Sequence, residues 1–229
     1  MKVSCPFHED TNPSMHIYES TAHCFVCGAH CPVEDVLSGV ELKKYNKQHK
    51  YSFEETMEYI SCLPVKEVRG LMLPVNTTGF YVVWPDKSYY KKRLYIGKNR
   101  YIGPPGMKPP LLKLGPQKAK SMLWVIEGEL NALSFNQCFP NEDVVSPGSA
   151  TELLRHIEFY LTFPYISVIV DKDDAGVAHG VILRDELAAR GKLCNLIAVK
   201  KDFNDVLQEK GKAGAKEEYL ALLGMYGLG

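Results

Sequence analysis

Two apolar runs that end in acidic residues carry the residue types that could do chemistry in this chain. The apolar run 122–126 ends in Glu127, and the run 166–170 ends in Asp171, with Asp173 two residues later. Each run predicts a buried parallel strand, and ligands of open α/β sheets bind outside the carboxyl ends of the strands. Carboxylates at close range repel, so a shared proton or a hard cation must neutralise them. We therefore expect Glu127, Asp171 and Asp173 to form a platform for Mg²⁺ or Mn²⁺ in phosphoryl transfer.

A simpler interpretation is that acids at strand ends cap the helices that follow. We prefer it for Asp174, and it is the alternative for Asp205 in the later segment 201–205, Lys-Asp-Phe-Asn-Asp. For the three acids of the platform, capping explains one residue at a time and not the set.

The N-terminal segment has the spacing of a metal site. Cys5 and His8 form C-x₂-H, and after fifteen residues Cys24 and Cys27 form C-x₂-C. Two such knuckles joined by a β-hairpin predict a closed Cys₃His site for structural Zn²⁺. Cys31 is the alternative if one of these ligands fails. We expect three further residues to be surface groups or hydrogen-bond partners rather than ligands: His16, His23 and His30.

Composition is that of an ordinary globular chain of 229 residues with a formal net charge of zero. The charge is unevenly placed, because residues 86–120 hold ten Lys and Arg against one Asp. Tyrosines alternate with these basic residues, a combination that offers phosphate contacts and stacking faces for a single strand. A solvated basic face is the alternative. No Walker-type nucleotide loop, apolar leader or membrane-length run occurs, so we expect a cytoplasmic protein with no membrane partner.

The elements that must position these residues are mixed, and the predicted fold class is α/β, or α+β overall. A capping box at 52–55 starts a helix that runs to about residue 60, and β-prone runs follow at 79–84 and 93–96. Short strands at 143–146 and 193–199 join the two acidic ones in a four-stranded, mostly parallel sheet. Helices are expected at 129–138, 150–161 and 175–190.

A strand ending in Glu-Gly, a strand ending in Asp-x-Asp and the segment Lys-Asp-x-Asn-Asp together resemble the TOPRIM domain, over residues 120–210. TOPRIM domains occur in bacterial-type primases, topoisomerases, nucleases and recombination mediators. The stretch CPFHEDTNPSM…CFVCGA resembles the zinc-binding domain of bacterial and phage DNA primases, although the usual Gly-Gly-Asp is replaced after residue 28. Zinc ribbon followed by TOPRIM indicates a primase.

The resemblance assigns further residues. It makes Asp202 another metal-binding acid, and it places a template-guiding basic ridge before the TOPRIM domain. Arg100 and Lys108 match that ridge best, and Arg93 and Lys98 are weaker candidates. Many primases carry Asp where this chain has Asn131, which brings no charge and weakens one metal site.

We therefore predict a DNA primase that makes short RNA primers from nucleoside triphosphates on single-stranded DNA, with structural Zn²⁺ and catalytic Mg²⁺ or Mn²⁺. A replicative helicase acting in trans is the expected partner. A non-enzymatic zinc–TOPRIM recombination mediator and a TOPRIM nuclease are the alternatives. The predicted parts are the ribbon at 1–39, a helical linker at 40–63, a basic β-rich subdomain at 64–119, the TOPRIM domain at 120–210 and a C-terminal helix and tail at 211–229.

Overall fold

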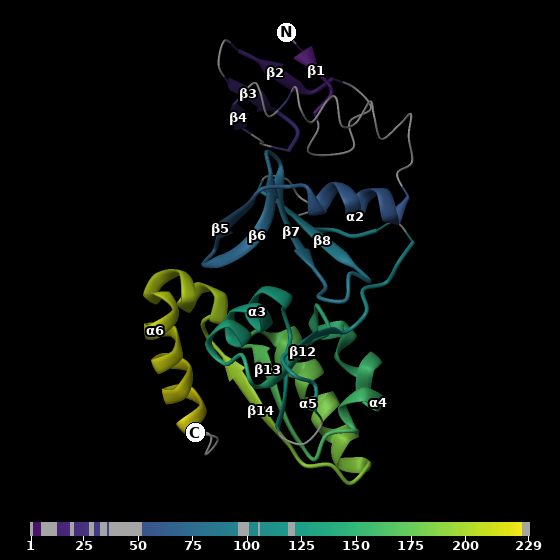
Figure 1. Cartoon of the computed structure of the whole chain (residues 1–229), viewed down its shortest axis with the longest axis vertical. Helices are drawn as coiled ribbons and strands as arrows, with labels where there is room; N and C mark the ends of the chain where they lie inside the picture. The colour runs from purple at the N-terminus through teal and green to yellow at the C-terminus, as the bar shows by residue number, and fades with distance from the viewer. Residues whose placement is uncertain are drawn as a thin grey trace. The chain divides into compact units, whose positions relative to one another are not determined.

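A computed structural model describes residues 2–5, 13–18, 21–27, 30–32 (backbone only), 36, 52–95, 101–104, 106–118 and 122–225. Within these residues the strands form three separate sheets (Figure 1). The chain divides into two compact units. One comprises Met1–Lys66, Met72–Val83 and Tyr89–Met107, and the other Glu67–Leu71, Trp84–Ser88 and Lys108–Gly229. None of the described helices combines the length and the apolar character that crossing a membrane requires.

The N-terminal sheet is a small antiparallel ribbon. Its strands follow one another in the order β1 (Lys2–Val3), β2 (Met15–Ile17), β3 (Thr21–Cys24) and β4 (His30–Pro32). The β-hairpin predicted between the two knuckles is thus present as β2 and β3. Because side chains alternate along a strand, one face of the ribbon is buried and the other is not. The buried set is Cys5, Met15, Ala22, Cys24 and Val36.

The middle of the chain is a helix packed on a five-stranded sheet. Helix α2 (Phe53–Ser61) starts at the predicted capping box, in which Glu55 N donates to Ser52 Oγ at 3.1 Å and Ser52 N donates to Glu55 Oε2 at 2.7 Å. Its Ile60 shares a core with Tyr81 and Tyr90 of the sheet. The predicted linker therefore contains a helix that packs on the β-rich part. The strands, in sheet order, are β5 (Val65–Val68), β6 (Leu71–Asn76), β7 (Gly79–Val83), β8 (Tyr90–Leu94) and β9 (Tyr101–Ile102).

The C-terminal sheet has the predicted parallel strands and one strand more. Parallel pairing joins β12 (Asp143–Ser146), β11 (Met122–Ile126), β13 (Tyr165–Asp171) and β14 (Cys194–Val199). The fifth strand, β10 (Leu112–Leu114), is antiparallel to β12 and forms an edge. Sequence reasoning counted four strands because β10 is very short and follows a Pro-rich segment. Leu112 and Leu114 are both buried, which is the apolar alternation that holds this strand on the sheet.

Helices cover both faces of this sheet, as expected for strands that are buried on both sides (Figure 1). On one face α3 (Glu129–Cys138) and α6 (Phe203–Met225) bring Phe135, Phe203 and Tyr219 into an aromatic cluster with Trp124. On the other face the sheet packs on α5 (Asp174–Ala189) and on the segment 150–160. That segment was predicted as one helix and is instead the 3₁₀ helix η1 (Ala150–His156) followed by the single α-turn α4 (Ile157–Tyr160).

Candidate metal centres

The predicted acidic platform lies at the carboxyl edge of the C-terminal sheet. Glu127 directly follows β11, Asp171 ends the neighbouring strand β13, and Asp202 lies between β14 and α6. Strands β11 and β13 are parallel, with Ile126 opposite Ile169, so their ends lie side by side. Asp171 N donates to Glu127 Oε2 at 3.3 Å. The fold therefore brings Glu127 and Asp171, which are 44 residues apart in sequence, to one rim with Asp202.

Two of these carboxyl groups are held in an unfavourable environment for charge. Burial, together with repulsion from the neighbouring carboxylates of Asp202, Glu127 and Asp173, raises the pKa of Asp171 to about 7. Burial also raises the pKa of Glu127, with Asp173 and Asp202 adding repulsion, while hydrogen bonds from the amides of Asp171 and Ala150 oppose the rise. The four acids therefore act on one another electrostatically, and a cation among them would relieve the repulsion.

Asp173 has a structural role as well. It is the N-cap of α5, and its Oδ1 accepts a hydrogen bond from Gly176 N at 2.6 Å. Our prediction that Asp174 caps this helix is wrong, because the helix begins one residue earlier than expected and Asp174 is its first residue. A Cβ at Gly176 would lie 2.9 Å from Glu127 Oε2 and 3.2 Å from Asp173 Oδ1. Only a glycine at this position lets both carboxylates approach the helix start so closely.

The carboxylates are spaced more widely than the ligands of a closed site. In the described part of the chain, only the three N-terminal cysteines form a group of three or more His, Cys, Asp or Glu residues with donor atoms all within 4.8 Å of one another. Mg²⁺ commonly takes one or two carboxylates directly and keeps several waters. The acidic rim fits that mode of binding, with the remaining carboxylates acting through water and through charge.

Several residues that support the acids were not recognised from sequence. Ser146, the last residue of β12, is buried and donates its hydroxyl hydrogen to the carbonyl oxygen of Glu127 at 3.0 Å. Asn131 is also buried, and its Oδ1 accepts from Asn204 N at 3.1 Å instead of facing water. The proposed cap Asp205 forms an ion pair with Arg69 at 2.9 Å. No local sequence pattern predicts these bonds, because each bond joins segments that are distant in the sequence.

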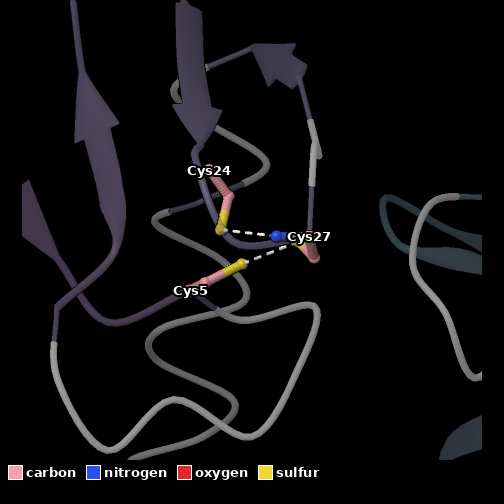
Figure 2. A group of neighbouring side chains, drawn as sticks. All are labelled: Cys5, Cys24 and Cys27. Carbon is pink, nitrogen blue, oxygen red and sulfur yellow. Dashed lines mark hydrogen bonds between the residues drawn. The ribbon is translucent and has the colours of Figure 1, made fainter.

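The cysteine site is compact. Cys5 follows β1, Cys24 ends β3, and Cys27 lies in the turn after it; their sulfur atoms point toward one another (Figure 2). Cys5 Sγ and Cys27 Sγ are 3.7 Å apart. Sulfur atoms bound tetrahedrally to zinc at 2.3 Å are separated by about 3.8 Å, so these three thiols fit structural Zn²⁺. The fourth predicted ligand, His8, lies outside the described residues, and nothing is described of the side chain of Cys31.

Cys24 is prepared for metal binding. Burial disfavours its thiolate, but hydrogen bonds outweigh burial and lower the pKa of Cys24 to about 7. They come from Ser14 Oγ, at 3.2 Å from the sulfur atom, and from the amides of Cys27 and Val26. Since the thiolate is the form that binds metals, this environment favours coordination at neutral pH.

The predicted basic ridge is only partly described. Arg93 lies on β8, where its guanidinium is 5.2 Å from the ring centre of Tyr101, and Lys91 Nζ is 4.6 Å from the same ring. Lys108 is exposed and belongs to the other compact unit. Lys98 and Arg100 lie outside the described residues. A single ridge formed by these residues therefore stays a prediction.

Comparison with known families decides the nature of the C-terminal part. Residues 124–207 match the family model described as Toprim-like. This segment forms a Toprim-like domain. The match contains all four acids of the rim and confirms the TOPRIM resemblance drawn from sequence. No curated protein sequence matches the chain.

Solved primase structures are similar to this chain. The primase fragment of the bacteriophage T7 primase-helicase protein is 15% identical, with a TM-score of 0.52 over 95% of this chain and 99% of that fragment. The Aquifex aeolicus primase, comprising zinc-binding and RNA polymerase domains, is 16% identical, with a TM-score of 0.49 over 98% of this chain and 78% of that one. For the E. coli primase catalytic core the values are 14% identity, a TM-score of 0.49, and 79% and 63% coverage. The T7 match shows that this chain has the fold of a phage primase fragment.

Proposed function

We propose that this chain is a DNA primase that joins nucleoside triphosphates into short RNA primers on a single-stranded DNA template. The observation that carries the proposal is the acidic rim of the Toprim-like domain, where burial and mutual repulsion raise the pKa values of Glu127 and Asp171. Buried carboxylates that repel one another lower the stability of the folded chain. A divalent cation bound with a triphosphate would compensate their charge.

The four acids would have two roles, metal binding and proton acceptance. Asp171 and Asp173, together with Asp202, would hold Mg²⁺ or Mn²⁺, which offsets the negative charge of the triphosphate when bound. Glu127 would bind the metal or accept the proton of the attacking 3′-hydroxyl. Its raised pKa is in the direction that a proton acceptor near neutral pH requires. The amides of Asp171 and Ala150 hold its carboxylate in place.

Other parts of the chain would bind the nucleic acid. We assign template binding to the zinc ribbon and to a basic ridge containing Arg93, Lys98, Arg100 and Lys108. The interleaving of basic and aromatic side chains, seen at Arg93 and Tyr101, supports single-strand binding. The T7 fragment comes from a primase-helicase protein. We therefore also propose that this chain works with a replicative helicase, which is a separate protein acting in trans.

The test is primer synthesis by the full chain with single-stranded templates, labelled ribonucleotides and Mg²⁺ or Mn²⁺. We expect short RNA products, and we expect Glu127→Gln to reduce their rate by at least about a hundredfold, since electrostatic stabilisation is commonly the largest catalytic contribution. The matched control is Asp174→Asn, which removes one exposed charge from the same helix start and should leave synthesis near the parent rate.

Three outcomes would overturn the proposal. Primer synthesis that persists in Glu127→Gln would remove the acidic rim from the reaction. Cleavage of the template by protein and metal alone would indicate a nuclease. DNA binding without nucleotide incorporation, unchanged in Asp171→Asn, would indicate a recombination mediator.

A further inference from the structure

A turn outside the Toprim-like match packs against the residues that follow Asp202. Arg69 and Gly70 join β5 to β6 and both have positive φ, 54° and 73°. Residues 67–71 belong to the same compact unit as the Toprim-like domain. A Cβ at Gly70 would lie 3.0 Å from Leu207 Cγ, so the turn sits directly on the first turns of α6. Its tight backbone brings the Arg69 side chain to the start of that helix.

Arg69 binds two residues of the segment 201–205 at once. Its Nε donates to Asn204 Oδ1 at 2.6 Å, and its Nη2 donates to Asp205 Oδ1 at 2.9 Å. In return, Asn204 Nδ2 donates to the carbonyl oxygen of Arg69 at 2.9 Å. The planar guanidinium presents several donors in a fixed geometry, which a lysine ammonium does not reproduce.

Asn204 is the centre of this network. It is only 1% exposed, and besides its bonds to Arg69 its Nδ2 donates to Ser134 Oγ at 2.9 Å. Its backbone amide donates to Asn131 Oδ1 at 3.1 Å. Ser134 and Asn131 are both on α3, the helix that directly follows Glu127-Gly128. Asn204 therefore ties the start of α6 both to the β5–β6 turn and to the helix that follows the first acid.

The network ends two residues from the acidic rim. Asp202 immediately precedes α6, and its carbonyl oxygen accepts from Val206 N at 3.1 Å in the first helical turn. Its carboxylate acts on those of Asp171 and Glu127. A shift of the α6 start would therefore move Asp202 relative to the other acids.

We propose that Arg69 and Asn204 are positioning residues of the acidic rim, which fix the Asp202 backbone so that its carboxylate contributes to divalent cation binding. The inference rests on the metal-binding part of the proposed function. Neither residue touches the acids' carboxylates in any contact described above, so they act through the position of the segment 201–205. Loss of a group that hydrogen-bonds directly to a metal ligand commonly costs about 10- to 100-fold in metal affinity, so residues that act through the backbone should have a smaller effect.

The experiment measures Mn²⁺ affinity of the full chain by electron paramagnetic resonance of free Mn²⁺, beside the thermal unfolding midpoint. We expect Arg69→Lys to weaken the affinity by roughly threefold to tenfold, below the range for a direct partner of a ligand, because lysine keeps the charge but lacks the paired Nε and Nη2 donors. The matched control is Arg190→Lys, at the exposed ion pair of Arg190 with Glu158 in the same unit, which should keep the parent affinity.

A second, milder variant keeps the test decisive if Arg69→Lys folds poorly. Ser134→Ala removes one partner of Asn204 without adding volume, and should weaken Mn²⁺ binding in the same direction by a smaller factor. Primer synthesis by either variant should recover at high Mn²⁺ concentration, which a general loss of folded protein would not allow.

Parent affinity in folded Arg69→Lys and Ser134→Ala would overturn the inference, as would lowered stability with unchanged affinity. A failure of the proposed function looks different. Mn²⁺ binding could depend on Glu127 and be weaker in Arg69→Lys while no template yields primers. In that case the positioning role is supported and the primase assignment is wrong.

Discussion

Lys92 is a charge placed on the covered face of the middle sheet. It lies opposite Tyr81 on the neighbouring strand, and Tyr81 shares the core beneath α2. Its Nζ donates to Thr78 Oγ1 at 2.5 Å and lies 5.3 Å from the Tyr81 ring centre. Burial lowers the pKa of Lys92 from 10.5 to about 8. The protonated form is therefore less favourable in the folded chain than in the unfolded chain.

We predict that Lys92→Met stabilises the protein at pH 7 by about 1 kcal/mol, since the lost hydrogen bond offsets part of the relieved burial. The size of this stabilisation depends on pH in a defined window. Below pH 8 the folded parent carries the full penalty of a buried ammonium. Between pH 8 and 10.5 it loses the proton while the unfolded chain keeps it, so the parent gains stability and the advantage of the variant shrinks. Urea unfolding followed by circular dichroism at pH 7 and pH 10 measures this difference; an advantage that is absent at pH 7, or constant to pH 10, contradicts the prediction.

At the scale of elements, the edge strand β10 depends on a glycine. Gly115 follows the strand with φ of 78°, and a Cβ there would lie 1.9 Å from the carbonyl oxygen of Glu142. The backbone of the segment before β12 therefore occupies the space that any side chain would need. Gln117 and Lys118 continue this contact, because Gln117 Nε2 donates to Val144 O at 3.3 Å and Lys118 N donates to Asp143 Oδ2 at 3.2 Å.

We predict that Gly115→Ala lowers the free energy of unfolding by about 3 kcal/mol or more, because strain at positive φ is added to a collision with backbone. Gly191→Ala is the matched control. Gly191 also has positive φ, 75°, but a Cβ there meets nothing within 4 Å, so its cost should be only about 1 kcal/mol. Urea unfolding followed by tryptophan fluorescence compares the two; equal costs would show that the backbone contact at Gly115 does not matter.

At the scale of the whole molecule, the ribbon has its own small core. That core consists of a few residues, and two of them are the candidate zinc ligands Cys5 and Cys24. Such a core is too small to be stable without help, and a bound metal contributes folding free energy directly. The chain's two tryptophans, Trp84 and Trp124, both belong to the unit that contains the Toprim-like domain. Tryptophan fluorescence therefore reports that unit and not the ribbon.

We predict that Cys24→Ser loses zinc and the ribbon fold but leaves the unfolding transition seen by tryptophan fluorescence unchanged. Metal content is measured by atomic emission on the purified chain. Cys62→Ser is the control, because Cys62 is exposed and outside the cysteine cluster, and it should keep its zinc. Full zinc content in Cys24→Ser would show that this cysteine is not a ligand.

Short-range patterns were enough to predict most of the local elements and the candidate residues. The apolar runs 122–126 and 166–170 specify buried strands, and the acids that end them must meet at one rim because parallel strands share a carboxyl edge. The cysteine spacing likewise predicts the cluster of three thiols that the structure contains. These features depend on short-range patterns, which are visible without coordinates.

The polar residues that support the rim could be identified only from the packed chain. Arg69 and Asn204 are 135 residues apart. Arg69 sits in a turn without a local signal, and the motif Lys-Asp-x-Asn-Asp that contains Asn204 does not show which residues Asn204 bonds. Asp173 and not Asp174 is the N-cap because α5 begins at Asp174. The fifth strand, β10, forms because Leu112 and Leu114 lie in a segment that pairs with β12. Hydrogen bonds between distant segments and the exact start of a helix depend on how the layers pack, and packing is not written in any short stretch of the chain.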